Sequence, residues 1–213
     1  MKNPAMSIIK MKKLVSVSRR ALFAYYMSRK VVIHLENFQN NGSLNGGQNQ
    51  SAGVIESVAE LILENPPAAL AQIHGSEQYP DIEGTVAFYP DNEGVLVLTA
   101  VTGLPTPSEE CGNTVHGMHI HDGGSCTGNE NDPFADAGAH YNPGDCPHPE
   151  HAGDLPPLFA SGGSAWNAVL LNRFGIDEVI GKTIIIHQKY DDFETQPSGD
   201  SGLKIACGVI AGL

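Results

Sequence analysis

The stretch Gly117-Met118-His119-Ile120-His121 places two histidines two residues apart in an apolar setting. Successive side chains of a β-strand point to opposite faces, so His119 and His121 would share one face, with Cβ atoms roughly 6.5–7 Å apart. Two ring nitrogens at this spacing can reach one metal ion at about 2 Å each. Met118 and Ile120 would point the other way, into a core. Such pairs also occur by chance, so the stretch indicates a half-buried strand and, less specifically, a metal site on a β scaffold.

Segments rich in β-branched and aromatic residues recur on both sides of this stretch. They cover residues 71–74, 82–89, 94–102, 115–121, 165–171, 182–189 and 204–210. The 24 glycines and 14 prolines favour turns between short strands. The pattern predicts seven or eight short strands in an antiparallel β-barrel or sandwich. Two long connections, 122–163 and 190–203, interrupt it, and loops of that length are usually functional or disordered.

The chain before residue 69 has a different character. Residues 1–53 form a basic tail followed by a linker rich in Asn, Gln and Gly, which we expect to be disordered. Residues 54–68 comprise a short helix, with apolar residues at helical spacing, and the break at Pro66-Pro67 that ends it. The domain itself is expected to span residues 69–213.

Charge limits the partners of this domain. Residues 51–213 carry four Lys or Arg against 23 Asp and Glu, a net charge of about −19. Such a body repels nucleic acid and anionic membranes, so we expect neither as a partner. No run of 18 apolar residues predicts a membrane span. An anionic substrate would need a local positive charge to reach a site.

Histidines concentrate in and around the long connections. The candidate ligands, with one aspartate, are His119, His121, His140, His148, His151, Asp154 and His187. One interpretation is a single zinc site with spare histidines, and another is a plain acidic loop. Seven donors are too many for one tetrahedral ion, and imidazoles suit copper or zinc. We therefore favour two adjacent metal sites.

Several motifs in this order resemble the copper/zinc superoxide dismutase family over residues 69–210, about two thirds of the chain. The motifs are Gly117-Met118-His119-Ile120-His121, Gly138-Ala139-His140-Tyr141-Asn142-Pro143, His151-Ala152-Gly153-Asp154-Leu155, Ile180-Gly181-Lys182-Thr183-Ile184-Ile185-Ile186-His187 and Ala206-Cys207-Gly208-Val209-Ile210. Gly124-Ser125-Cys126 is more similar to bacterial members. The resemblance implies an eight-stranded Greek-key β-barrel or sandwich with two functional loops.

The resemblance also implies the cofactors and the reaction. Each subunit would hold one copper, on His119, His121, His140 and His187, and one zinc, on His140, His148, His151 and Asp154. His140 would bridge the two ions and carry a proton while superoxide is converted to dioxygen and hydrogen peroxide. Asp191 matches a family aspartate that connects a copper ligand to a zinc ligand, here His119 and His148, although it also reads as a solvated loop acid.

One position departs from the family pattern. Lys204 stands where the family usually has an arginine above copper. Lysine keeps the positive charge that is known to steer superoxide in this family, but it lacks the planar fork of a guanidinium. We therefore expect dismutation that is retained but slower and more sensitive to salt. The alternative function is a non-catalytic copper-binding or copper-delivery domain on the same fold.

Four cysteines allow three pairings. The resemblance implies a disulfide between Cys126 and Cys207. Cys111 and Cys146 could form a second disulfide that braces the zinc loop, remain free thiols, or, for Cys146, bind zinc. Disulfides favour an oxidising compartment, but the N-terminal apolar run is a poor signal peptide. We expect a cytoplasmic location by default, with export left open, and either a monomer or a homodimer.

Overall fold

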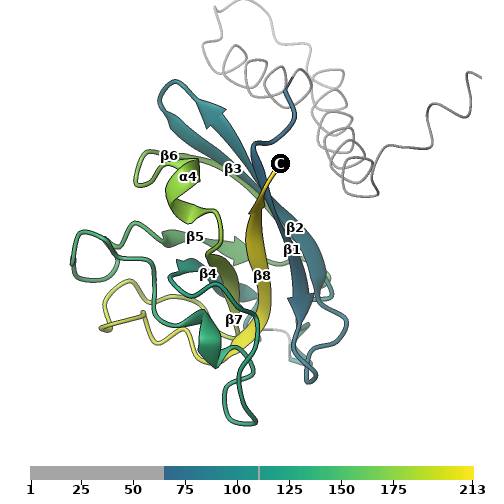
Figure 1. Ribbon diagram of the computed structural model, residues 1–213. Coiled ribbons are helices and arrows are strands. Elements are labelled where there is room, and N and C mark those ends of the chain that lie inside the picture. The colour runs from purple at the N-terminus through teal and green to yellow at the C-terminus, as the bar shows by residue number, and fades with distance from the viewer. Residues whose placement is uncertain (1–64, 110) are drawn as a thin grey trace, which may run out of the picture. The chain divides into compact units, whose positions relative to one another are not determined.

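The computed structural model describes residues 65–109 and 111–213 (Figure 1). The expected basic tail, the linker and the helix before Asn65 lie outside the described residues. Pro67–Leu213 form one compact unit. Among the residues described, no helix has the length and apolar character needed to cross a membrane.

Eight antiparallel strands make a single sheet that curls into a nearly closed barrel. The strands are β1 (Ala69–Gly75), β2 (Glu83–Asp91), β3 (Gly94–Thr102), β4 (Val115–His121), β5 (Asp154–Phe159), β6 (Ala165–Leu171), β7 (Thr183–His187) and β8 (Lys204–Gly212). Their order in the sheet is β5-β4-β7-β8-β1-β2-β3-β6, and the two ends of this order, β5 and β6, contact each other. The all-β, eight-stranded fold expected from the sequence is thereby confirmed.

The core fills the barrel because alternate side chains of each strand point inward. Met118 and Ile120 of β4 are fully buried there with Ile184 and Ile186 of β7 and Phe88 of β2. The opposite face of β4 is therefore free to present histidines. β4 and β7 are hydrogen-bonded neighbours, so the outer faces of these two strands form one continuous surface.

The expected long connection 122–163 contains a strand that the sequence pattern did not predict. β5 carries Pro156 and Pro157, which cannot donate backbone hydrogen bonds. Proline is tolerated at the edge of a sheet, and β5 is the first strand in the sheet order. The connection between β4 and β5 therefore ends at Gly153, and Asp154 starts a strand.

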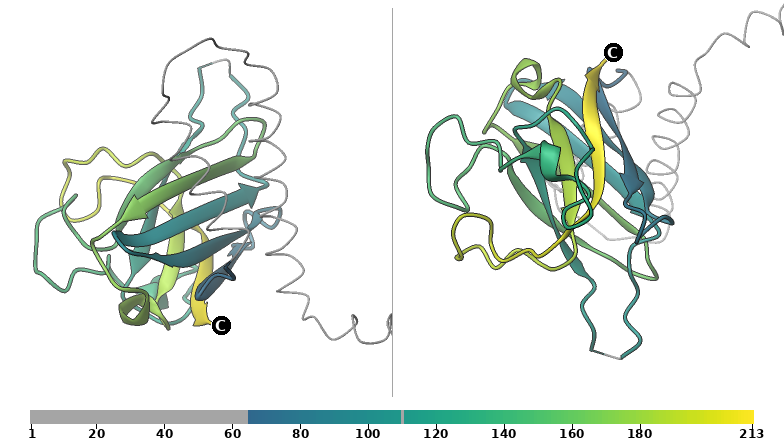
Figure 2. Two further views of the ribbon diagram at one scale, coloured as in Figure 1. Left: turned by 90° about the horizontal axis from the view of Figure 1, so that it is seen from above. Right: turned by 60° about the horizontal axis from the view of Figure 1, so that its bottom comes forward.

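Two long loops lie side by side on the same side of the barrel. They are residues 122–153, after β4, and residues 188–203, between β7 and β8 (Figures 1 and 2). The first loop includes the short helix η1 (Ala135–Ala137), and a four-residue helix, α4 (Ile176–Val179), precedes β7. Phe134 and Ala137 pack on Ile185 and Cys207 in a small cluster of buried residues outside the main core.

Candidate metal centre

Strand register brings the first set of histidines together. On β4, His119 pairs with Ile185 and His121 with Thr183 of β7, and His187 ends β7 two residues beyond the partner of His119. An isolated bridge joins His121 to His140 from the loop. One ring nitrogen of each of the four histidines lies within 4.8 Å of those of the others. We call His119, His121, His140 and His187 the four-histidine group.

Backbone hydrogen bonds fix the segment that carries His140. Tyr141 donates to the carbonyl of Ile120 at 2.8 Å, and Ile120 donates to the carbonyl of Gly153 at 2.8 Å. A Cβ at Gly153 would lie 2.3 Å from the carbonyl oxygen of Ile120, so only glycine allows this close approach. The loop is thereby docked along β4, which places His140 beside His119 with ring centroids 3.9 Å apart.

A second set of donors gathers on the other side of His140. His140, His148, His151 and Asp154 bring one donor atom each within 4.8 Å of one another, and all four are buried. Asp154 is the centre of this set. Its Oδ1 lies 2.7 Å from Nδ1 of His140, and its Oδ2 lies 3.0 Å from Nδ1 of His148. We call these residues the three-histidine–aspartate group.

Hydrogen bonds to oxygen decide which nitrogen each ring turns toward its group. Nδ1 of His121 donates to the carbonyl of Gly138 at 2.8 Å, which leaves Nε2 facing the group. Nε2 of His119 donates to Asp191 at 2.7 Å, which leaves Nδ1 free. Nδ1 of His119 and Nε2 of His140 are buried and have no hydrogen-bond partner among the described residues. Buried polar atoms normally have partners, so these two nitrogens mark a place for a ligand.

The donor spacing fits metal ions. Nε2 of His121 and Nε2 of His187 are 3.4 Å apart, as are Nδ1 of His140 and Nδ1 of His151. Ligands about 2.0–2.1 Å from a tetrahedral ion are separated by about 3.3–3.4 Å. His140 turns Nδ1 to one group and Nε2 to the other, so a single imidazole can serve both.

Electrostatics favour the protonation states that metal ligands need. Burial lowers the pKa of His121 and His187 well below the usual histidine value, and also lowers the pKa of His119, because an imidazolium is costly to remove from water. Burial would raise the pKa of Asp154, but its hydrogen bond with His140 outweighs this and lowers it. Neutral imidazoles and an ionised carboxylate are therefore expected at neutral pH.

Asp191 connects the two groups from the second loop. Burial would raise its pKa, but hydrogen bonds from His119 and His148 outweigh this and hold it well below the usual range. Its Oδ2 accepts from Nε2 of His119 at 2.7 Å, and its Oδ1 from Nε2 of His148 at 2.9 Å. Gly199, with φ of +69°, passes so close that a Cβ would lie 2.0 Å from Oδ1. One carboxylate thus orients one histidine of each group.

Gln196 in the second loop also contacts the first loop. Its amide accepts from the backbone N–H of His148 at 2.9 Å and donates to the carbonyl of the same residue at 2.7 Å. Sequence reasoning did not find Gln196. A glutamine in a polar loop has no distinctive spacing, and its partner lies 48 residues away.

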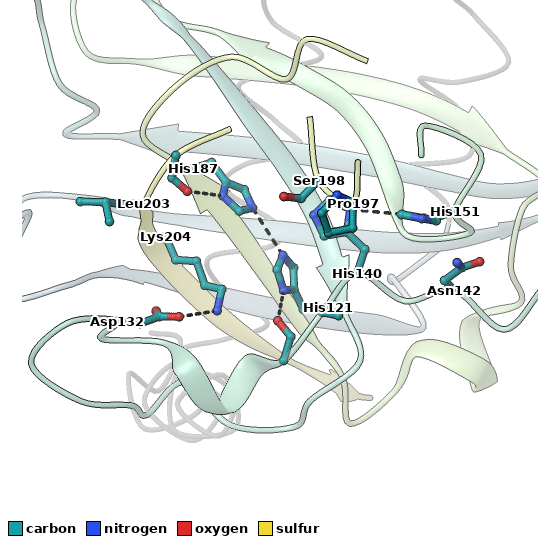
Figure 3. Close-up of a pocket in the computed structure, with 13 residues that line it drawn as sticks. His121, Asp132, His140, Asn142, His151, His187, Pro197, Ser198, Leu203 and Lys204 are labelled. Atoms are coloured by element: carbon teal, nitrogen blue, oxygen red, sulfur yellow. Dashed lines mark hydrogen bonds and ion pairs between the residues drawn. The ribbon is translucent and has the colours of Figure 1, made fainter. Parts of the chain in front are cut away.

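A cavity of about 430 Å³ opens over the four-histidine group (Figure 3). His121, His140 and His187 line it, and Lys204 lies at its side as the cross-strand partner of His187. Nζ of Lys204 donates to Oδ2 of Asp132 at 2.7 Å, as the dashed line in Figure 3 marks. Asp132 also lines the cavity, and it was not predicted because it lies 72 residues from Lys204 in the chain.

The structure contains one disulfide among the described residues, Cys126–Cys207, with Cα atoms 5.6 Å apart. It ties the first loop to β8. Cys111 and Cys146 are free and exposed. The second disulfide considered from the sequence is therefore not formed. The physical reason for the difference is that spacing along a chain does not determine which cysteines meet in space.

These features define a class: a β-barrel protein with two adjacent groups of donors that could each hold a metal ion and that share one histidine. Comparisons identify the family. Residues 82–210 match copper/zinc superoxide dismutase (SODC). The chain belongs to the copper/zinc superoxide dismutase family. Its reaction is accordingly the dismutation of superoxide, and its cofactors are copper and zinc.

Bacterial proteins are among those similar to this chain. The chain is 32% identical to "Superoxide dismutase [Cu-Zn]" of Deinococcus radiodurans over 63% of this chain and 80% of that protein. It is 36% identical to the protein of the same name from Photobacterium leiognathi, over 60% and 78%. The solved structure titled "Cu/Zn superoxide dismutase from Brucella abortus" superposes with a TM-score of 0.56 at 27% identity, covering 66% of this chain and 98% of that one.

Proposed function

We propose that the four-histidine group holds copper, that the three-histidine–aspartate group holds zinc, and that His140 bridges the two ions during superoxide dismutation. The observation that carries the proposal is the placement of His140. Its Nδ1 lies 2.7 Å from Asp154 in one group, while its Nε2 is buried without a partner beside the other. A single ring turned to two donor sets is the arrangement that a bridging imidazole needs.

The donor types support the assignment of each metal. Four imidazoles suit copper, whereas three imidazoles and a carboxylate suit zinc. Copper supplies one-electron redox chemistry when bound, and zinc has none. The zinc ligands come from the first loop and the start of β5, so this group's role is to order the loop that carries His140.

The chain's own residues have separate tasks in this reaction. His140 lines the cavity, and its Nε2, which is buried without a partner among the described residues, is the atom at which we place the proton that leaves with hydrogen peroxide. Asp191 is a positioning residue, because it fixes the rings of His119 and His148 through hydrogen bonds. Among the described residues, Lys204 is the one lysine or arginine that lines the cavity, so it supplies the positive charge there.

We infer that Lys204 supports a lower rate than arginine would. Its amine is a single point donor, and its contacts in the structure go to Asp132 and to the carbonyl of Phe134. A guanidinium could satisfy those acceptors and still direct another N–H into the cavity. The lysine position is therefore expected to be functional but less effective in drawing an anion toward copper.

The test is a dismutation assay on the full chain loaded with copper and zinc, with the content of both metals measured in the same samples. His140→Ala should abolish turnover and reduce the content of both metals, because one side chain serves both groups. His74→Ala is the matched control, since His74 is an exposed histidine on β1 that belongs to neither group.

Two outcomes would count against the proposal. Full loading of the unaltered chain without turnover would favour the copper-binding or copper-delivery domain instead. Loss of only one metal in His140→Ala would show that the imidazole does not bridge.

A further inference from the structure

Every lysine and arginine among the described residues is paired with a carboxylate. The pairs are Arg173–Glu150, Lys182–Asp122, Lys189–Asp200 and Lys204–Asp132. The Lys204–Asp132 pair is the least exposed overall, with side chains 15% and 38% accessible. It is also the pair in which both partners line the cavity. The charge that could attract an anion is therefore offset at the entrance itself.

Local structure holds Asp132 in the position that makes this contact. Its Oδ1 accepts a hydrogen bond from the backbone N–H of Phe134 at 3.0 Å, and its Oδ2 accepts from Nζ of Lys204 at 2.7 Å. The carbonyl of Phe134 accepts a second hydrogen bond from the same amine at 3.1 Å. Both oxygens of the carboxylate and two protons of the ammonium group are thus engaged.

The surrounding loop is itself anchored on both sides of Asp132. Oδ1 of Asn129 accepts a hydrogen bond from the backbone N–H of Asp132 at 3.1 Å, which closes a local turn. Phe134 is buried against Ile185, and the Cys126–Cys207 disulfide ties the start of the loop to β8. The carboxylate is therefore held beside Lys204 by the fold of the loop and does not depend on the ion pair alone.

We propose that Asp132 is a positioning residue that restrains Lys204 and limits the rate at which anions reach the four-histidine group. This inference rests on the proposed function, since it concerns the approach of superoxide to copper. Asp132 keeps the amine turned toward the loop and adds a negative charge to the cavity wall. Removing that charge while keeping its shape should leave Lys204 as an unpaired cation at the entrance.

The test compares Asp132→Asn with the unaltered enzyme, both loaded with copper and zinc. We expect kcat/KM for superoxide to rise about threefold to tenfold at low ionic strength, which is at or below the lower end of the tenfold to thousandfold range for electrostatic steering. The gain should shrink as salt is added, because surface charges are screened beyond about 10 Å at 0.1 M ionic strength. Azide, used as a small anionic probe and followed by its copper absorption band, should bind more tightly by a similar factor.

The matched control is Glu130→Gln. Glu130 lies in the same loop, is exposed, and does not line the cavity, so this variant changes the net charge equally. It should leave kcat/KM and azide affinity close to those of the unaltered enzyme. Asp132→Glu keeps the negative charge, so its kcat/KM and azide affinity should also stay close to those of the unaltered enzyme. A second comparison, Asp132→Asn in a Lys204→Ala background, should show a much smaller gain, because the effect acts through Lys204.

Equal kcat/KM, salt dependence and azide affinity in Asp132→Asn and Glu130→Gln would overturn the inference. So would a lower unfolding temperature of the metal-free Asp132→Asn protein with no change in azide affinity, which would make the ion pair a structural brace. Failure of the proposed function looks different. The fully loaded enzyme would then show no turnover, while the azide comparison would still report whether Asp132 restrains Lys204.

Discussion

His119 and Asp191 lie 72 residues apart in the chain, yet Nε2 of His119 donates a 2.7 Å hydrogen bond to Oδ2 of Asp191. The other oxygen of this carboxylate accepts from Nε2 of His148 at 2.9 Å. Both rings are thus held with Nδ1 turned toward their groups. Asp191 is 3% exposed, so water cannot readily replace either contact if the carboxylate is lost.

We therefore expect Asp191→Asn to weaken metal binding by about 10–100-fold, the usual effect of removing a hydrogen-bond partner of a metal ligand. The measurement is competition with a chelator for zinc and for copper. Asp192→Asn is the control, because Asp192 is a half-buried neighbour whose carboxylate accepts from the backbone N–H groups of Glu194 and Thr195 and contacts neither group. Equal affinities in the two variants would show that Asp191 does not position the ligands.

Replacing Lys204 with arginine should speed the reaction. A guanidinium has five N–H donors, so it can form the hydrogen bonds to Asp132 and to the carbonyl of Phe134 and still present another donor to the cavity. We expect Lys204→Arg to raise kcat/KM by up to about tenfold at low ionic strength. Lys204→Ala should lower kcat/KM and flatten its salt dependence. An unchanged rate and salt dependence in Lys204→Ala would remove the steering role.

The disulfide is expected to contribute substantially to stability. Cys126 and Cys207 are 81 residues apart, so their bond closes a long loop in the unfolded chain. Its loss should lower the free energy of unfolding by about 2–5 kcal/mol. Urea unfolding of the metal-free Cys126→Ser protein measures this. Cys111→Ser and Cys146→Ser should leave the free energy nearly unchanged because both thiols are free and exposed, and a cost equal to that of Cys126→Ser would contradict the assignment.

Metal-free protein should lose stability as the pH falls below about 7. Burial lowers the pKa of His121 and His187 in the folded state, so the unfolded chain binds more protons below the usual histidine pKa of about 6.5. Stability is full above that pH and declines below it, by about 1.4 kcal/mol per pH unit for each histidine. Urea titrations from pH 8 to 5 test this, and His187→Gln should show a shallower slope. A slope unaffected by His187→Gln would contradict the prediction.

The sequence predicts the regular parts of this fold well. β3, β4 and β6 begin and end at the expected residues because β-branched and aromatic side chains fill them and turn residues bound them. β5 was not predicted because two prolines in six residues are typical of loops. A strand with these prolines is possible there because it lies at the edge of the sheet.

The ligand residues were predictable and some of their partners were not. Histidines at strand spacing and in a glycine-rich loop carry a pattern that a sequence displays. Asp132 and Gln196 are ordinary loop residues whose importance lies in partners 72 and 48 residues away. No local rule connects such distant positions, since the barrel's strand order decides which loops meet. The pairing of cysteines depends on the same long-range arrangement.

The shared position of His140 has a consequence for how the two ions affect each other. Because His140 belongs to both groups and Asp191 holds one histidine of each, ordering either group also orders part of the other. Occupation of the zinc site should therefore raise copper affinity. Thermodynamic reciprocity then requires copper to raise zinc affinity by the same factor. The barrel would in this way favour fully loaded and empty molecules over half-loaded ones.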